Sequence, residues 1–369
     1  MWSDIQFALR VLIKSPTYTL VSVLALALGI STATSQFTFF NAIVLKPMVG
    51  VKDEGRLVRI KSSTSRTDVG DPEFSEPNFL DVRKQSKTLE GEALTMDRTF
   101  IISGGEQPER VLGAWISAAG LDMLGVKPIL GRNFRPEEDE PGCEAVAVIG
   151  FGLWQRSFGG NKSIIGQSVT LNGEPVTIVG VMPEGFGFPH SHELWMPYRY
   201  NSEMGKQTEE ERRTELGMPF FARMKPGVTL KQVQAELDVI AASLAKEHPV
   251  SNEGVGFRAN LVRDEEVKDV RRPMYAMLGS VLFVLLISCA NVANLMLARA
   301  ATRTREVAIR TALGAGRGRI IRQVLTEGLL LGLMGGGLGV ILSMWSIDLI
   351  RAMIPIGIPF WIRFDLGFS

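Results

Sequence analysis

Cysteine and histidine are scarce in this sequence, and neither sign of charge is in excess. Its 369 residues include two cysteines, Cys143 and Cys289, and three histidines, and the formal net charge is +1. Cys289 lies inside a long apolar run, so a disulfide between the two cysteines is not expected, and neither has the spacing of a zinc site. A balanced charge creates no field that attracts nucleic acid. Disulfide scaffolds, zinc modules and nucleic-acid binding are therefore not expected.

The motifs of nucleotide binding and of catalysis are also missing. The nearest approach to a phosphate-binding loop is Gly159-Gly160-Asn161-Lys162-Ser163, where Asn161 separates the glycines from Lys-Ser, so the GxxxxGK[ST] spacing fails. No serine stands in a G-x-S-x-G elbow, and no Cys/His pair has a supporting context. We therefore expect no cofactor and no catalytic site, and any ATP that drives this protein must bind to another polypeptide.

Two clusters of metal-binding side-chain types have simpler explanations. His190, His192 and Glu193 follow a proline, which predicts a loop at a strand end and a role in surface or packing contacts. The acidic run Glu137–Glu140 precedes Pro141-Gly142 and is predicted to be a solvated turn. We therefore expect no metal site at either place.

Long stretches without charge are the strongest positive feature. Thr17–Leu45 holds no charged residue over 29 positions, which is longer than the apolar core of a cleaved signal peptide. Pro273–Ala298 and Gly328–Ile347 are also uncharged, and about 20 apolar residues suffice to cross a bilayer as a helix. We predict three transmembrane helices, and the lack of charge in them favours a bundle that transmits motion over a hydrophilic pore. Their predicted ranges are 17–45, 273–298 and 323–350.

Residues 46–272 differ from these runs, because charges are frequent and Gly/Pro turns are regularly spaced. Asn172-Gly173 predicts a hairpin between two strands, and Thr229 is a good N-cap for an amphipathic helix. The fold class expected is an α-helical membrane protein with a large α+β extracytoplasmic domain of two subdomains. The lower one is split in sequence, at about 46–105 and 215–265, and the β-rich upper one covers about 106–214.

Basic residues orient the chain. The segment 299–322 carries seven arginines between two apolar runs, which is typical of a cytoplasmic loop. An amphipathic helix in residues 1–16, with Arg10 and Lys14, is expected on the cytoplasmic membrane surface. The N-terminus is then inside, and residues 46–272 and 351–369 are outside.

The basic loop divides into a short predicted helix, Thr304–Leu313, and a glycine hinge, Gly314–Gly318. Glu306 and Arg310 form a favourable i,i+4 pair in that helix. A short rigid helix of this kind is suited to docking in a groove of a partner and tilting the attached spans. The alternative is that its arginines only bind lipid phosphates.

Small and polar residues inside the spans predict helix contacts. Gly328, Gly332 and Gly336 stand four apart, with Gly335 and Gly339 as a second such pair, as in close-packed membrane helices. Asn291 and Asn294 share one face of the second span, and polar side chains in lipid usually face a partner helix.

Three stretches resemble the MacB/FtsX family of ABC-type permeases, with most similarity to the acidobacterial duplicated orphan permeases, which have no fused ATPase. The first begins FALRVLIKSPTYTL. The second contains VIGFGLWQRSFGGNKSIIGQSVTLNGEPVTIVGVMPEGF. The third begins CANVANLMLARAATRTREVAIRTALGAGRGR. The first two resemble the MacB-like periplasmic core domain, and the third is similar to the FtsX-type permease core. The three stretches lie at Phe7–Pro47, at Ala118–Asp139 with Val148–Phe186, and at Cys289–Gly339.

This resemblance implies an inner-membrane permease that transmits the motion of a separate ATP-binding subunit to a periplasmic domain, in export or efflux. A periplasmic adaptor or a second permease copy is a further partner of such proteins. Relatives have four spans, so a chain with three is expected to be truncated before a fourth; the alternative is a natural half-length variant. The residues that match the family's ATPase-coupling segment are Arg305, Glu306, Arg310, Ala312, Leu313, Gly314 and Ala315.

Two rival functions remain open on the sequence alone. FtsX-like relatives are non-transporting regulators that activate a cell-wall hydrolase, usually with a smaller outer domain than residues 46–272. A membrane-anchored enzyme is the third hypothesis, although no catalytic constellation supports it.

Overall fold

A computed structural model describes residues 2–46, 51–64, 72–103, 108–198, 207–302 and 317–353. These residues form two compact units, each described here by itself. The helical unit contains the described residues before Pro47 and after Lys268, and the α/β domain contains those between them. Helix α9 (Val262–Thr302) contributes its first seven residues to the α/β domain and the rest to the helical unit.

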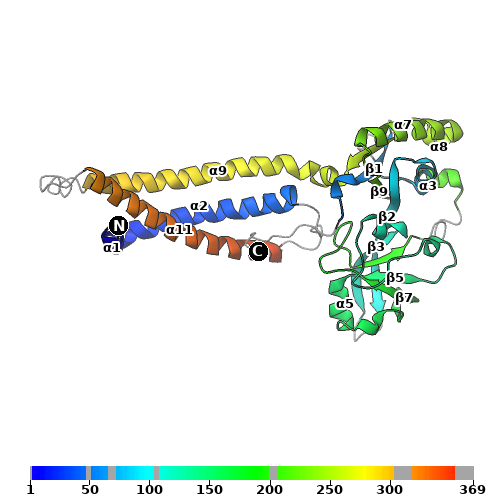
Figure 1. The fold of residues 1–369 in the computed structure, drawn as a ribbon, viewed down its shortest axis with the longest axis horizontal. Coiled ribbons are helices and arrows are strands. Elements are labelled where there is room, and N and C mark those ends of the chain that lie inside the picture. Colours follow the sequence, from blue (N-terminus) through cyan, green and yellow to red (C-terminus); the bar gives the residue numbers. More distant parts are fainter. Residues whose placement is uncertain are drawn as a thin grey trace. The chain divides into compact units, whose positions relative to one another are not determined.

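Three helices of the described segments are long and apolar enough to cross a membrane, which confirms the predicted number of spans. Within the helical unit they lie side by side (Figure 1). They are α2 (Pro16–Phe40), extended by the π-helical turn η1 (Asn41–Leu45), then α9, and α11 (Arg317–Met353).

The N-terminal helix α1 (Trp2–Ile13) joins α2 through a tight elbow. Pro16 is the first residue of α2, where its fixed φ and missing amide hydrogen fit the start of a helix. The Ser15 hydroxyl donates to the Val11 carbonyl at 2.9 Å and so satisfies an acceptor at the end of α1. Leu12 is buried and Arg10 is exposed, so α1 is amphipathic as predicted.

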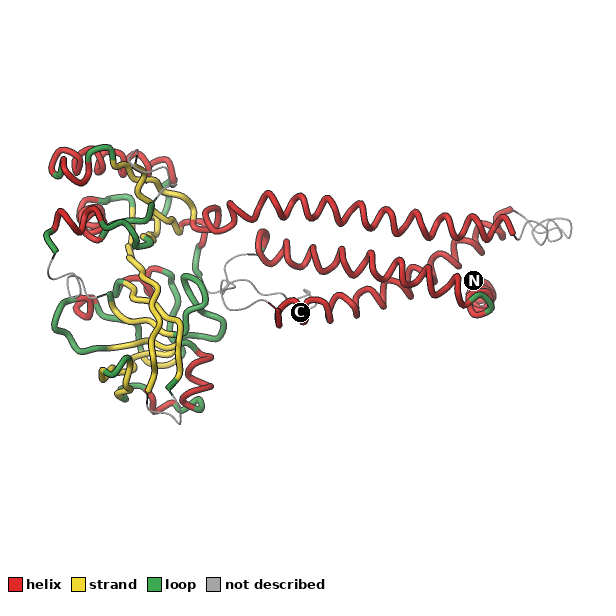
Figure 2. The backbone as a smooth tube through the Cα atoms, turned by 180° about the vertical axis from the view of Figure 1, so that it is seen from behind, coloured by secondary structure: helices red, strands yellow, loops and turns green. Residues whose placement is uncertain are grey.

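The α/β domain is built on one ten-stranded mixed sheet, visible as the connected yellow strands in Figure 2. The main path runs β10-β1-β9-β2-β3-β8-β5-β7-β4, and β6 pairs with β2 and β7. The β3–β8 and β5–β7 pairs are parallel and the others antiparallel. The strands are β1 (Leu57–Thr64), β2 (Leu89–Ser103), β3 (Glu109–Ile116), β4 (Leu130–Gly131), β5 (Val146–Ile149), β6 (Ser168–Leu171), β7 (Glu174–Val181), β8 (Leu194–Pro197), β9 (Phe220–Met224) and β10 (Val255–Leu261).

Strand β2 belongs to both halves of this sheet and links the two subdomains. Its first half pairs with β9, and its second half pairs with β3 and β6. Leu94 accordingly lies in the hydrophobic cluster of the lower subdomain, while Phe100 lies in that of the upper one. A third cluster, which includes Trp195, fills the space between them. The chain crosses between the subdomains several times, so they form one compact unit.

Helices cover the sheet where the sequence carries apolar stripes. Val233, Leu237 and Leu244 are buried along α7. Thr229 caps that helix in a capping box with Gln232, as predicted. The Asn172-Gly173 hairpin between β6 and β7 is also confirmed. The helices and single turns of the domain are η2 (Glu54–Arg56), α3 (Glu76–Gln85), α4 (Ala119–Met123), η3 (Pro136–Asp139), α5 (Phe151–Phe158), η4 (Lys162–Ile164), α6 (Glu209–Thr214), α7 (Leu230–Glu247) and α8 (Pro249–Asn252).

The acidic run Glu137–Glu140 is not the solvated turn that the sequence predicts. Glu138 is buried and accepts from Arg132 at 2.6 Å and from the Arg135 amide at 2.8 Å. Asp139 is 5% exposed and accepts from the Ala118 amide at 2.7 Å. Burial raises the pKa of the Asp139 carboxyl to about 6. The prediction was wrong because these partners lie outside the run itself.

Candidate functional site

The residues predicted to couple to an ATPase lie outside the described part of the chain. Residues 303–316 include Arg305, Glu306, Arg310, Ala312, Leu313, Gly314 and Ala315. The described residues on either side, the end of α9 and the start of α11, nevertheless show how the helices that lead into this loop are held together.

Arg299, near the end of α9, contacts three other helices. Its Nη1 donates to Glu327 Oε1 of α11 at 2.8 Å. Its Nη2 donates to the Val11 carbonyl of α1 at 3.0 Å and also to the Ser15 hydroxyl. The guanidinium carbon lies 4.4 Å from the ring centre of Tyr18 in α2, a cation–π contact. We call Arg299, Glu327, Val11, Ser15 and Tyr18 the Arg299 clamp.

The two charges of the Arg299 clamp are buried against each other. The Arg299 side chain is 15% exposed and that of Glu327 is 9% exposed. Charges this deeply desolvated are stable only when they are paired and hydrogen-bonded. The clamp therefore fixes the ends of α1, α2, α9 and α11 relative to one another, next to the predicted coupling loop.

The sequence alone did not reveal this pair. In the sequence, Glu327 stands just before the uncharged run Gly328–Ile347. In the structure, the helical segment that can cross a membrane is Ile321–Leu349, which includes Glu327. The view that the spans hold no charge is thus corrected, since Glu327 lies within the third. The sequence did contain a signal for this pair. Arg299 directly follows one apolar run and Glu327 directly precedes the next. Because a loop joins these two helix ends, the two side chains can be expected to lie close together.

Helix α11 packs on α2 through glycines, mainly through Gly335 and Gly339. A Cβ added at Gly335 would lie 2.6 Å from the Leu26 Cβ, and one at Gly339 would lie 3.0 Å from the Ala27 carbonyl oxygen. Further along this seam the hydroxyls of Ser35 and Ser346 are 2.8 Å apart. Close approach of this kind is the use of small residues in membrane helices.

The other glycine row lies mostly off this seam. A Cβ at Gly328 would meet Met296 of α9 at 3.5 Å, and one at Gly336 would meet Ile30 only at 4.0 Å. Around Gly332 no other described atom lies within 4 Å of such a Cβ. Gly328 therefore faces α9, and the tight contact with α2 belongs to the second pair.

Helix α9 contacts α2 near both Gly29 and Phe40. A Cβ at Gly29 would lie 2.6 Å from Ser288 Oγ, and the rings of Phe40 and Tyr275 are 5.3 Å apart. Asn291 and Asn294 are both exposed in the helical unit. Their predicted partner helix is thus not found among the described residues.

The first turns of α9 are tied to β1 of the α/β domain by ion pairs. Lys61 Nζ lies 2.7 Å from Glu265 Oε1, and Arg59 Nη1 lies 3.4 Å from Glu266 Oε1. Nearby, Arg263 of the same helix pairs with Glu54 at 3.1 Å. All six side chains of these three ion pairs are mostly shielded from solvent, and Glu265 is only 7% exposed. The root of α9 is therefore fixed to the domain at several points.

The histidine cluster is a packing feature with one polar contact. His192 is buried, and its Nε2 lies 3.2 Å from Asp97 Oδ1. This contact lowers the pKa of the Asp97 carboxyl, while burial lowers the pKa of His190. Within the described ranges no three His, Cys, Asp or Glu side chains are arranged to hold a metal ion.

Comparison with known families agrees with this architecture. The family model of the MacB-like periplasmic core domain matches residues 19–240, which is more than half of the chain, and that of the FtsX-like permease C-terminal matches residues 278–368. The chain belongs to the MacB/FtsX family of ABC transporter permeases. The chain is therefore a membrane-bound permease. Its membership in this family also accounts for the order along the sequence, in which helical segments precede and follow one α/β domain.

Two proteins with sequences similar to this chain are named as export proteins. The pyoverdine export ATP-binding/permease protein PvdT of Pseudomonas syringae pv. tomato is 28% identical over 59% of this chain and 32% of that protein. The macrolide export ATP-binding/permease protein MacB 2 of Aeromonas hydrophila is 32% identical over 60% of this chain and 33% of that protein. The chain thus spans about a third of the length of these curated relatives.

A solved structure is also similar. The periplasmic region of MacB from Actinobacillus actinomycetemcomitans aligns over 62% of this chain and 97% of that one, with a TM-score of 0.44 and 14% sequence identity.

Proposed function

We propose that this chain is the permease subunit of an ABC-type export or efflux system in which a separate ATP-binding subunit moves the α/β domain through α9. The family supports the class of protein. The names of PvdT and MacB 2, both exporters, support the direction of transport.

The single observation that carries the mechanical part is the construction of α9. It is one helix of 41 residues, about 60 Å along its path at 1.5 Å per residue. A bilayer core is about 30 Å thick, so such a helix reaches well beyond it. Ion pairs fix its first turns to β1, and the Arg299 clamp fixes its last turns to three helices. We propose that α9 transmits a displacement at its loop end to the α/β domain.

The location follows from the same reasoning. With the arginine-rich loop 299–322 in the cytoplasm, α1 and the N-terminus are cytoplasmic and the α/β domain is periplasmic, in the inner membrane. A periplasmic adaptor and a second permease copy are the further partners we propose. The exposed amides of Asn291 and Asn294 suit a contact with another helix.

Co-purification from native membranes tests the coupling residues. We predict that an ATP-binding subunit co-purifies with the chain. The double variant Arg305→Glu with Arg310→Glu should lower its recovery at least tenfold, because the new carboxylates would repel a partner surface that is complementary to the arginines. Arg258→Glu, on the exposed side of β10, is the matched control and leaves recovery unchanged. Recovery of no ATPase in repeated trials, or equal recovery with all variants, contradicts the proposal.

A further inference from the structure

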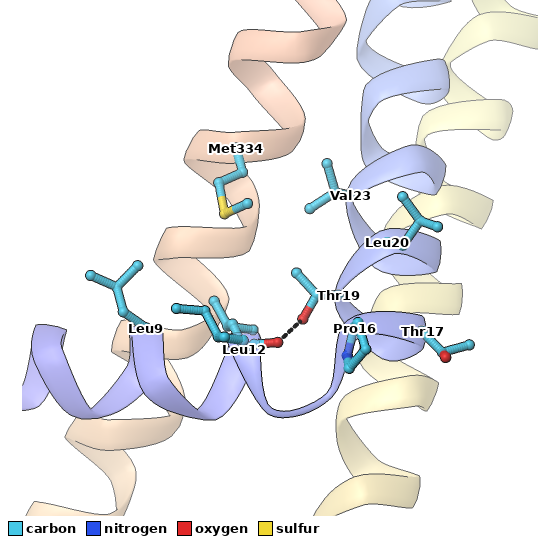
Figure 3. A pocket seen from close by; sticks show the side chains of 9 residues that line it. Leu9, Leu12, Pro16, Thr17, Thr19, Leu20, Val23 and Met334 are labelled. Carbon is cyan, nitrogen blue, oxygen red and sulfur yellow. Dashed lines mark hydrogen bonds between the residues drawn. The ribbon is translucent and has the colours of Figure 1, made fainter.

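An apolar groove lies at the elbow between α1 and α2. Its volume is about 560 Å³, within the roughly 300–1,000 Å³ range of ligand pockets. Figure 3 shows its walls, which come from both arms of the elbow and from α11. They include Leu9, Leu12, Ile13, Leu20, Val23 and Met334.

The groove presents carbon rather than polar atoms. The hydroxyl of Thr19, which also lines it, donates to the Leu12 carbonyl at 2.8 Å and to the Ser15 carbonyl at 3.0 Å. That hydroxyl is thus satisfied within the elbow. A site with so few polar partners does not hold ordered water, so its occupant must be apolar.

The groove opens to the outside of the helical unit. The side chains of Leu9, Ile13 and Leu20 are 42%, 75% and 60% exposed. These residues stand where an amphipathic surface helix turns into a span, at the boundary between lipid headgroups and acyl chains. A hydrocarbon chain can therefore enter without crossing a polar barrier.

Two exposed cations of the α1–α2 elbow are adjacent in sequence to residues that line the groove. Arg10 and Lys14 are one turn apart, both exposed, and directly follow the groove residues Leu9 and Ile13. Among the described residues neither forms an ion pair, and Glu327 is engaged by Arg299. An apolar slot flanked by cations is complementary to a lipid with a negative headgroup.

We propose that this groove binds one acyl chain of an anionic phospholipid whose phosphate lies against Arg10 and Lys14. The site goes beyond the transport function and does not depend on it. A second copy of α1 is a less suitable occupant. A two-fold contact between two such elbows would bring its Arg10 and Lys14 against these cations.

Native mass spectrometry of the full-length chain in detergent tests the site. Delipidated protein is titrated with phosphatidylglycerol and, separately, with phosphatidylethanolamine of identical acyl chains. We expect one saturable site that favours phosphatidylglycerol at least tenfold, since each cation near a lipid surface contributes roughly fivefold.

Three variants separate the parts of the site. Arg10→Gln with Lys14→Gln removes the preference but keeps the binding of both lipids. Leu20→Trp fills the groove and abolishes the saturable binding of both lipids. Leu325→Trp, at a position of α11 that is 67% exposed, leaves both unchanged.

Three results would overturn the proposal. One is equal affinity of the wild-type chain for both lipids. Another is an equal loss of lipid with Leu20→Trp and Leu325→Trp, which would mean ordinary surrounding lipid only. The third is a dimer that must dissociate before lipid binds, which would show that a second copy of the chain occupies the groove. The glutamine variant changes only exposed side chains, so its result stands even if Leu20→Trp fails to fold.

Discussion

Arg299 has a structural role that the positive-inside rule alone does not predict. Seven arginines lie between residues 299 and 322, and the positive-inside rule treats them alike. The structure adds that the Arg299 guanidinium is desolvated and has partners on α1, α2 and α11. A lysine could not reproduce this, because it lacks the planar fork that binds several acceptors at once.

A double-mutant cycle tests the Arg299 clamp. Arg299→Gln or Glu327→Gln alone leaves one buried charge without its partner, and each should destabilise the helical unit by about 3 kcal/mol. The double variant should cost clearly less than the sum, because it leaves no unpaired charge. Thermal unfolding of the full chain in detergent measures all three. Strictly additive losses would show that the pair is not coupled.

Asp139 makes stability depend on pH. Its folded pKa of about 6 lies above its ordinary value. The stability it contributes is therefore complete below pH 4 and is lost as the pH rises through 6. Asp139→Asn should be more stable than wild type by about 2 kcal/mol at pH 8, and the difference should shrink below pH 5.

Chemical denaturation of both proteins at pH 4.5, 6 and 8 measures this difference. Glu137→Gln, at an exposed position of the same turn, is the control and should show no such trend. A difference between Asp139→Asn and wild type that is the same at all three pH values would contradict the assignment.

At the scale of elements, α2 and α11 meet along a seam that depends on two glycines. Close contact requires that the backbone of α11 approach Leu26 and Ala27 directly. Ser35 and Ser346 add a hydrogen bond at the other end of the seam. The periodicity of the glycines in the sequence suggested two rows, and only the contacts decide which row is buried.

Two matched alanine substitutions distinguish the rows. Gly335→Ala places a methyl group 2.6 Å from the Leu26 Cβ, which cannot rotate away because it is bonded to the backbone. It should lower the melting temperature of the chain in detergent. Gly332→Ala meets nothing described and should be neutral or stabilising by about 0.5–1 kcal/mol, the helix preference of alanine over glycine. Equal losses in both variants would contradict the seam.

Elements with local determinants could be predicted, and those with distant ones could not. The Asn172-Gly173 turn and the Thr229 cap rest on residues within a few positions and were correct. The first half of the long strand β2 lacks a regular local pattern, because Gly91, at φ +77°, interrupts it and shifts its register. The strand crosses two subdomains, which no local pattern encodes.

The candidate site follows the same division. The basic loop, the three spans and the amphipathic helix α1 could be read from charge and hydrophobicity. The Arg299–Glu327 pair and the ion pairs at the root of α9 join residues 28 or more positions apart. Their positions in the sequence carry no periodic signal, so only the folded chain reveals them.

At the scale of the whole molecule, α9 is the element that belongs to both units. Its first turns are tied to β1 and its last turns lie in the Arg299 clamp. In the function proposed above, the loop after α9 docks on an ATP-binding subunit, and we propose that this helix links the motion of that subunit to the α/β domain.

Electron paramagnetic resonance distances between the two units test this account most directly. Spin labels are attached at Val239→Cys and Leu349→Cys, both exposed positions, after Cys143 and Cys289 are replaced by serine. The labelled chain is reconstituted in lipid with its ATP-binding subunit, and a hydrolysis-deficient subunit is the control. The account predicts a distance distribution that differs between ATP and ADP, and no difference for Arg305→Glu with Arg310→Glu. An unchanged distribution while the complex binds and hydrolyses ATP would contradict it.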